Sequence, residues 1–167
     1  MNYLLDTCVV SEFTKPQRDA HLLDWLRATP ETSLYLSALT LGEIQQGVSR
    51  LAVSARRQHL QSWLDDDLRA RFTGRVLPAD AAVCLLWGDL RTRAARSGHT
   101  LPMLDSLIAA TALVHGLLLV TRNEADFVSV PGLQVVNPWT LAPVLTPPGA
   151  GLKPRPAPRR RGAGSSR

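Results

Sequence analysis

Short apolar segments alternate with longer amphipathic segments along most of this chain. Five apolar segments are short enough to be buried strands, and they cover residues 3–5, 34–36, 75–77, 117–120 and 133–136. The intervening sequence predicts helices over residues 11–15, 21–28, 38–51, 53–71, 79–97 and 103–115. This alternation predicts an α/β fold with three αβα layers around a central, mainly parallel sheet.

The alternation stops before residue 146, which divides the chain into two predicted parts. Residues 1–145 are long enough to form one compact domain with its own core. Residues 146–167 consist largely of Pro, Gly, Ser and Arg and have almost no apolar surface to bury. We therefore expect this basic tail to be disordered.

The net charge of +5 belongs to the tail rather than to the domain. Six of the 19 Lys and Arg residues lie beyond residue 145, and none of the 14 acidic residues does, so the domain has 13 cations against 14 acids. The high isoelectric point is therefore weak evidence about what the domain binds. The tail itself could bind nucleic acid nonspecifically.

The hydropathy of the chain, its N-terminus and its two cysteines bear on the cellular location of the protein. No stretch is long and apolar enough to span a bilayer, and the N-terminus lacks the basic residues of a signal peptide. Cys8 and Cys84 have no CxxC spacing, and we expect both to be small buried side chains in a reducing compartment. These patterns predict a cytoplasmic protein with no membrane association.

Four acidic residues occupy positions where a buried fold normally avoids charge. Asp6 ends the first strand, Glu43 borders the apolar stripe of a helix, Asp105 begins an almost uniformly apolar helix, and Asp126 follows the strand at 117–120. Acidic side chains are rarely buried unless paired, and none of the four has a cation at an evident pairing distance in sequence. Singly, each could be a surface or helix-terminus residue. Together they indicate a cluster at the carboxyl edge of the sheet, where ligands of α/β proteins bind.

A cluster of carboxylates without basic partners requires a cation to neutralise it. Oxygen ligands without Cys or His favour Mg²⁺ or Mn²⁺, and Mg²⁺ held by few carboxylates keeps several waters and typically contacts substrate phosphates. One or two such ions could activate water and stabilise the leaving oxygen in phosphodiester cleavage.

The four acids lie in or beside five sequence motifs. In chain order these are Leu4-Leu5-Asp6-Thr7 with Ser11-Glu12, residues 37–43, residues 105–112, Val120-Thr121-Arg122-Asn123 with Asp126-Phe127, and Val136-Asn137-Pro138-Trp139. Together, and in this order, the motifs resemble the PIN-domain family, and most closely the VapC and FitB-like toxins of bacterial toxin–antitoxin pairs. The resemblance runs from Met1 to about Trp139, and it is the combination of motifs that is specific.

This resemblance implies a PIN-like fold and a Mg²⁺- or Mn²⁺-dependent endoribonuclease that is the toxin of a toxin–antitoxin pair. It further implies a homodimer that is inhibited by a small DNA-binding antitoxin. The implied site consists of the acids Asp6, Glu43, Asp105 and Asp126, with Asn123 as a metal ligand or an alternative to Asp126, and with Thr7 and Thr121 in support.

One position departs from the family pattern. The family commonly has Asn after the Asp-Thr pair, where this chain has Cys8. A side chain that points away from the site would tolerate this change, whereas one that helps to hold the acids would not.

Other functions remain open from the residues alone. A phosphatase that forms an aspartyl-phosphate on Asp6 usually has a second Asp two residues later, and this chain has Cys8 there. A degenerate PIN domain would keep the acids without turnover and act only as a protein- or nucleic-acid-binding module. The residues specify neither the RNA target nor the antitoxin.

Overall fold

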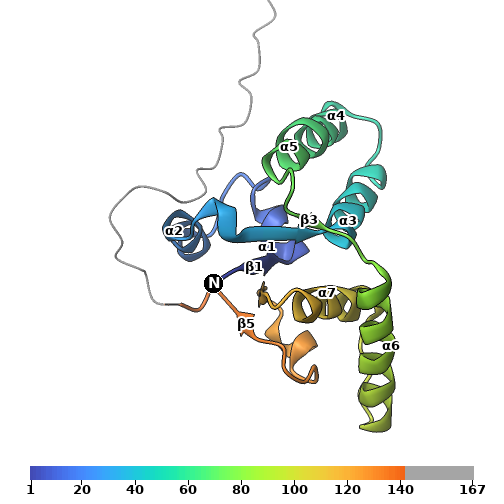
Figure 1. The fold of residues 1–167 in the computed structure, drawn as a ribbon. Coiled ribbons are helices and arrows are strands. Elements are labelled where there is room, and N and C mark those ends of the chain that lie inside the picture. Colours follow the sequence, from blue (N-terminus) through green and yellow to red (C-terminus); the bar gives the residue numbers. More distant parts are fainter. Residues whose placement is uncertain (142–167) are drawn as a thin grey trace, which may run out of the picture.

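The computed structural model describes residues 1–141 (Figure 1). The predicted tail at residues 146–167 therefore lies outside the described part. Among the described helices, none combines the length and apolar character that crossing a membrane requires.

Five parallel strands form the centre of the fold, in the order β3-β2-β1-β4-β5. The central strand is β1, where Leu4 pairs with Tyr35 on one side and with Leu119 on the other. All four neighbouring pairs are parallel, which confirms the predicted sheet. The strands are β1 (Tyr3–Leu5), β2 (Leu34–Ser37), β3 (Val76–Leu77), β4 (Leu118–Val120) and β5 (Val135–Val136).

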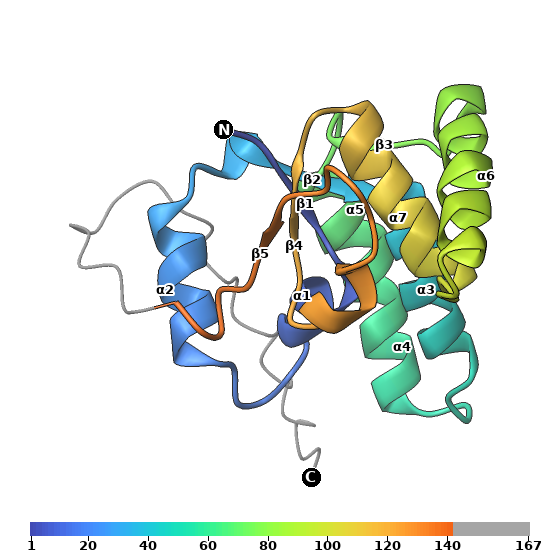
Figure 2. The same cartoon turned by 90° about the horizontal axis from the view of Figure 1, so that it is seen from below.

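Helices cover both faces of the sheet and complete the three predicted layers (Figures 1 and 2). One face is covered by α1 (Thr7–Glu12), α2 (Ala20–Ala28), α3 (Ala38–Ser49), α4 (Ala55–Ser62), the π-helical turn η2 (Trp63–Leu68) and α5 (Arg69–Arg71). The other face is covered by α6 (Ala81–Arg96) and α7 (Met103–Val114). Two 3-10 turns, η1 (Glu31–Ser33) and η3 (Glu124–Phe127), precede β2 and follow β4.

The central strands are apolar throughout because their side chains are buried on both faces. Leu5 and Val120 pack into the core beneath α1, α2 and α3, whereas Leu4 and Leu119 pack into the core beneath α6 and α7. All four side chains are fully buried. The strand ends, rather than the strand interiors, are therefore the places where polar groups can gather.

Two helix predictions need correction. The first helix begins at Thr7 rather than residue 11, because Asp6 Oδ1 accepts a hydrogen bond from the Thr7 backbone N–H and caps the helix directly after β1. The single helix predicted over residues 53–71 is interrupted by η2. Leu64 and Leu68 within that turn still face the core.

A charged network fixes the edge strand β3 against the start of β2. Arg71 donates two hydrogen bonds to the carboxylate of Glu31, at 3.0 and 3.2 Å. Arg75 donates to the backbone carbonyls of Glu31 and Leu34 and stacks on the ring of Phe72. Burial alone would raise the pKa of Glu31, but the two arginines together lower it below its ordinary value.

Replacing the charge in this network is expected to weaken the fold in a pH-dependent way. Glu31→Gln should lower the free energy of unfolding at neutral pH by about 1 kcal/mol, because two arginines lose their ionic acceptor. Since the folded pKa lies below the ordinary value of 4.5, this stabilisation is complete above that value and is lost as the pH falls through the folded pKa. Urea unfolding of parent and variant across this range measures the difference.

The matched control is Asp24→Asn, which removes an exposed ion pair with Arg27 within α2. Its effect on unfolding should be close to zero at every pH. An equal loss in both variants would mean that the Glu31 network has no special role in holding β3.

Candidate active site

Asp6 is a buried carboxylate at the carboxyl end of the central strand, and only 6% of it is exposed. Its Oδ1 accepts a hydrogen bond from the Thr7 backbone N–H at 2.7 Å. Its Oδ2 accepts hydrogen bonds from Thr121 Oγ1 at 2.6 Å and from Cys8 Sγ at 3.2 Å. Three donors therefore fix the orientation of this carboxylate.

Two threonines connect Asp6 to the neighbouring elements. The Thr7 hydroxyl donates to Oε2 of Glu43, which lies on α3 and is half-buried. The Thr121 hydroxyl, directly after β4, accepts from the backbone N–H of Asn123 at 3.0 Å. A continuous set of hydrogen bonds thus joins α3, the β1–α1 junction and the segment that follows β4.

Asp105 lies in the first turn of α7 and joins the same cluster through charge. Burial raises its pKa, and the negative charges of Asp6, Asp126 and Glu43 raise it further. The structure therefore brings the other three predicted acids within electrostatic range of Asp105. Asp126 is exposed and lies in η3, which packs against α7.

The two candidates for the fourth position differ in their surroundings. The negative charge of Asp126 helps to raise the pKa of Asp105. Asn123 is exposed, and the hydrogen bond it donates to Thr121 comes from its backbone N–H rather than its side chain.

The expectation that both cysteines are buried core side chains is wrong. Cys84 is exposed, and Cys8 is half-buried with its thiol directed at Asp6. The backbone N–H of Arg122 also donates to Cys8 Sγ at 3.4 Å. Sequence reasoning missed this contact because the side chain after a capping residue has no fixed direction until the helix start is known.

The environment of Cys8 keeps it in the thiol form. Burial, together with the negative charge of Asp6, raises its pKa from 9.0 to about 11. A neutral thiol can donate a hydrogen bond to a carboxylate, whereas nucleophilic attack requires the thiolate. Cys8 therefore supports Asp6 and is not suited to be a nucleophile at neutral pH.

The donor chemistry of this cluster fits a hard divalent cation. Within residues 1–141, no Lys or Arg forms an ion pair with any of the four acids. In the same range, no three His, Cys, Asp or Glu side chains are arranged so that they could hold a metal ion together. Mg²⁺ needs no such complete set, because it is usually bound by one or two carboxylates and keeps several waters.

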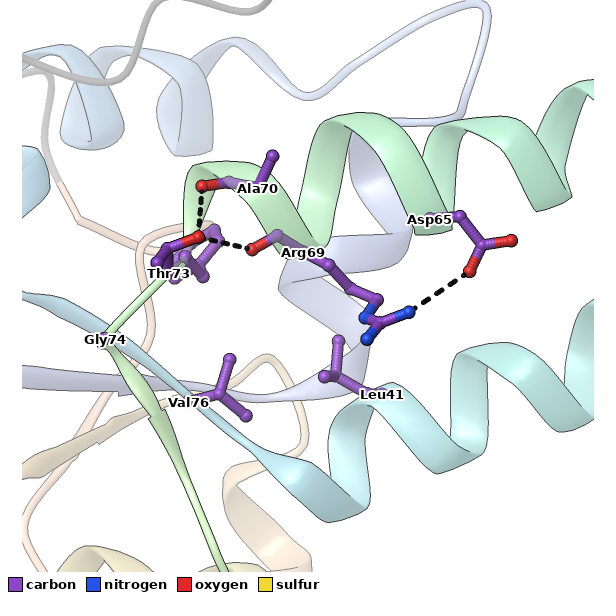
Figure 3. Close-up of a pocket in the computed structure, with 8 residues that line it drawn as sticks. Leu41, Asp65, Arg69, Ala70, Thr73, Gly74 and Val76 are labelled. Atoms are coloured by element: carbon purple, nitrogen blue, oxygen red, sulfur yellow. Dashed lines mark hydrogen bonds and ion pairs between the residues drawn. The ribbon is translucent and has the colours of Figure 1, made fainter.

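A pocket of about 520 Å³ lies elsewhere, between α3, α5 and β3 (Figure 3). Arg69 and Asp65 form an ion pair of 3.7 Å at its rim, and the Thr73 hydroxyl donates to the backbone carbonyl of Ala70 at 2.9 Å. None of the four acids lines this pocket.

Comparison with known families decides how the acidic edge should be interpreted. The PIN domain model matches residues 3–133, which is most of the chain. The chain belongs to the PIN domain family. The resemblance stated from the sequence motifs is therefore confirmed, and the acids gathered at the sheet edge lie within the matched region.

Similar proteins cover nearly the same length as this PIN domain chain. A VapC ribonuclease of Sinorhizobium fredii is 37% identical over 136 residues, which are 81% of this chain and 96% of that protein. The toxin FitB of Neisseria gonorrhoeae is 35% identical and covers 81% of this chain and 97% of its own length. The crystal structure of FitAcB from Neisseria gonorrhoeae has a TM-score of 0.78 at 34% identity and covers 83% of this chain and 99% of that one.

The raised pKa of Cys8 predicts an unreactive thiol. In a Cys84→Ser variant, the alkylation rate of Cys8 should still be rising at about pH 10, where an ordinary thiol has nearly levelled off. The matching Cys8→Ser variant gives the alkylation rate of Cys84, the exposed thiol, for comparison. A rate for Cys8 whose midpoint lies near pH 9.0, the ordinary thiol pKa, would contradict the described environment.

The charge at Asp105 is expected to cost stability when no metal is present. Because its folded pKa is raised above 3.8, stability falls as the pH rises through this interval, and the penalty is present at neutral pH. In chelator, Asp105→Asn should therefore raise the melting temperature by roughly 2 °C. If Mg²⁺ binds the charged cluster, it should stabilise the parent more than the variant.

The control for this measurement is Asp89→Asn, which removes an exposed acid on α6. It should leave both the melting temperature and the response to Mg²⁺ unchanged. A variant at Asp105 that is less stable than the parent in chelator would show that its carboxylate is not under repulsion.

Proposed function

We propose that this PIN domain protein is a metal-dependent endoribonuclease and the toxin of a toxin–antitoxin pair. The observation that carries the proposal is the gathering of four carboxylates, without a paired cation among the described residues, at the carboxyl edge of the sheet. Similar proteins over most of this length are named VapC ribonuclease and toxin FitB.

The acids Asp6, Glu43 and Asp105 form the proposed metal site, with Asp126 or Asn123 as the fourth residue. Because no three acidic side chains among residues 1–141 are placed to hold one ion together, one or two carboxylates would contact the metal and the others would reach it through water. When bound there, Mg²⁺ or Mn²⁺ would lower the pKa of water and stabilise charge on the phosphate oxygens during hydrolysis.

The other residues of the site hold the carboxylates in place. Thr121 and Cys8 donate to Oδ2 of Asp6, and Thr7 donates both to Asp6 and to Glu43. Supporting hydrogen bonds of this kind orient metal-binding side chains and typically change metal affinity or activity by about 10- to 100-fold. In this chain the thiol of Cys8 takes part in that support.

The proposed partners follow from the same relationship. Solved structures of similar chains include FitAB bound to a DNA fragment and the VapBC2 complex of Rickettsia felis bound to promoter DNA. We propose that this protein likewise pairs with a DNA-binding antitoxin, forms a homodimer and acts in the cytoplasm on cellular RNA.

Cleavage of cellular RNA by purified protein tests the function. With Mg²⁺ or Mn²⁺, the parent should give discrete cuts, and chelator should abolish them. Asp6→Asn should reduce cleavage by at least about 100-fold, because the amide has no charge to bind the metal. The fold should persist, since Asn caps a helix about as well as Asp.

Asp24→Asn is the matched control, because it removes an exposed carboxylate on α2 far from the proposed chemistry in the sequence. It should cleave at the parental rate. Absence of cuts by folded, antitoxin-free parent with either metal would overturn the nuclease proposal and favour the binding-only PIN domain. Equal cleavage by parent and Asp6→Asn would exclude Asp6 from the site.

A further inference from the structure

The backbone of Arg122 lies at the edge of the acidic cluster, and its side chain has no role in the site described so far. It follows Thr121, whose hydroxyl donates to Asp6, and its own backbone N–H donates to the thiol of Cys8. The backbone at this point continues the sheet, because the N–H of Thr121 donates to the carbonyl of Val136 at 3.1 Å. The position of Arg122 is therefore fixed relative to Asp6, while its side chain is exposed.

The guanidinium of Arg122 rests on an aromatic ring rather than on a carboxylate. Its central carbon lies 5.6 Å from the centroid of the Trp139 ring. Trp139 is half-buried against the core beneath α1 and α2, and its backbone N–H donates to the side chain of Asn137. A stack of this kind restricts the side chain without neutralising its charge.

Nearby acids do not take up this charge. Glu124, two residues away, accepts a hydrogen bond from the Asn137 side chain at 2.6 Å. Among residues 1–141, Arg122 forms no ion pair with a carboxylate. The residue after Thr121 thus carries an exposed cation that no carboxylate of the described residues pairs with, and this cation remains available to an anion from outside.

We infer that Arg122 is a substrate-binding residue that contacts a phosphate of the RNA backbone beside the acidic cluster. A guanidinium matches the oxygens of a phosphate with two parallel hydrogen bonds, and such charge-assisted pairs are among the stronger polar contacts. Without such a cation, the four carboxylates would repel the phosphate that has to approach them. The inference rests on the proposed ribonuclease function and adds to it the group that draws the substrate to the site.

The structure also offers a matched control for this arginine. Arg91 is likewise exposed and stacked on a tryptophan, with its central carbon 5.5 Å from the ring centroid of Trp87. It lies on α6, outside the hydrogen bonds around Asp6. Arg91→Gln therefore removes the same charge and the same type of stack from a different part of the surface.

The test compares the purified parent with Arg122→Gln, Arg122→Lys and Arg91→Gln on a short single-stranded RNA that spans a mapped cut site. In chelator, where no cleavage occurs, Arg122→Gln should weaken RNA binding about tenfold. The slope of log affinity against log salt should fall by about 0.7, the value for one lost phosphate contact. With metal, KM should rise about tenfold while kcat changes by less than about threefold, because the contact is made in both ground and transition states.

The lysine variant keeps the charge without the planar fork and should recover part of the affinity. Binding and KM of Arg122→Gln within about twofold of the parent would overturn the inference. An equal loss in Arg91→Gln would also overturn it, because the effect would then be one of overall charge. A parent that binds RNA but never cleaves it would count against the proposed function, and the binding measurements would still decide the role of Arg122.

Discussion

The hydrogen bonds received by one buried acid at the end of the central strand join the elements that make up the rest of the structure. A carboxylate removed from water is costly unless hydrogen bonds replace its hydration, and Asp6 receives three. The donors lie at the start of α1 and at the end of β4. The hydrogen bonds that Asp6 needs therefore hold α1 and β4 in place relative to β1. Because Thr7 also donates to Glu43, the same requirement extends to α3. The fold and the candidate site are therefore specified by the same contacts.

At the acidic edge, the folded protein contains carboxylates that repel one of their number, Asp105. Asp105 is pushed toward its protonated form by burial and by three other acids, and no Lys or Arg of the described chain is ion-paired with them. Functional sites commonly sacrifice stability in this way. Such repulsion is relieved when a cation binds among the carboxylates. The cluster therefore supports both the proposed metal ion and the proposed phosphate-binding arginine at its edge.

Much of this could be predicted from the sequence, and the exceptions have physical causes. Strand positions and the parallel sheet followed from apolar runs, since strands buried on both faces tolerate little else. Asp6 and Asp126 could be grouped because the strands they follow end at one edge, whereas Glu43 and Asp105 lie on helices and joined the predicted site through the family resemblance. The start of α1 was missed because the capping role of Asp6 overrides the weaker periodicity that follows it. The hydrogen bond from the Arg122 backbone to the Cys8 thiol joins residues 114 positions apart, and no local pattern encodes such a contact.

The strand order has a consequence for how the site comes into being. Asp6 and the Thr121 hydroxyl that donates to it are separated by 115 positions, and β4, which lies beside β1 in the sheet, follows α1 to α7 in the chain. Proteins are synthesised from the N-terminus, so Asp6 and Glu43 leave the ribosome long before Asp105, Thr121 and Asp126 do. A nascent chain of this protein therefore spends most of its synthesis without an assembled site. If the protein cuts RNA as proposed, a chain still on the ribosome would lack the site that could cut its own message.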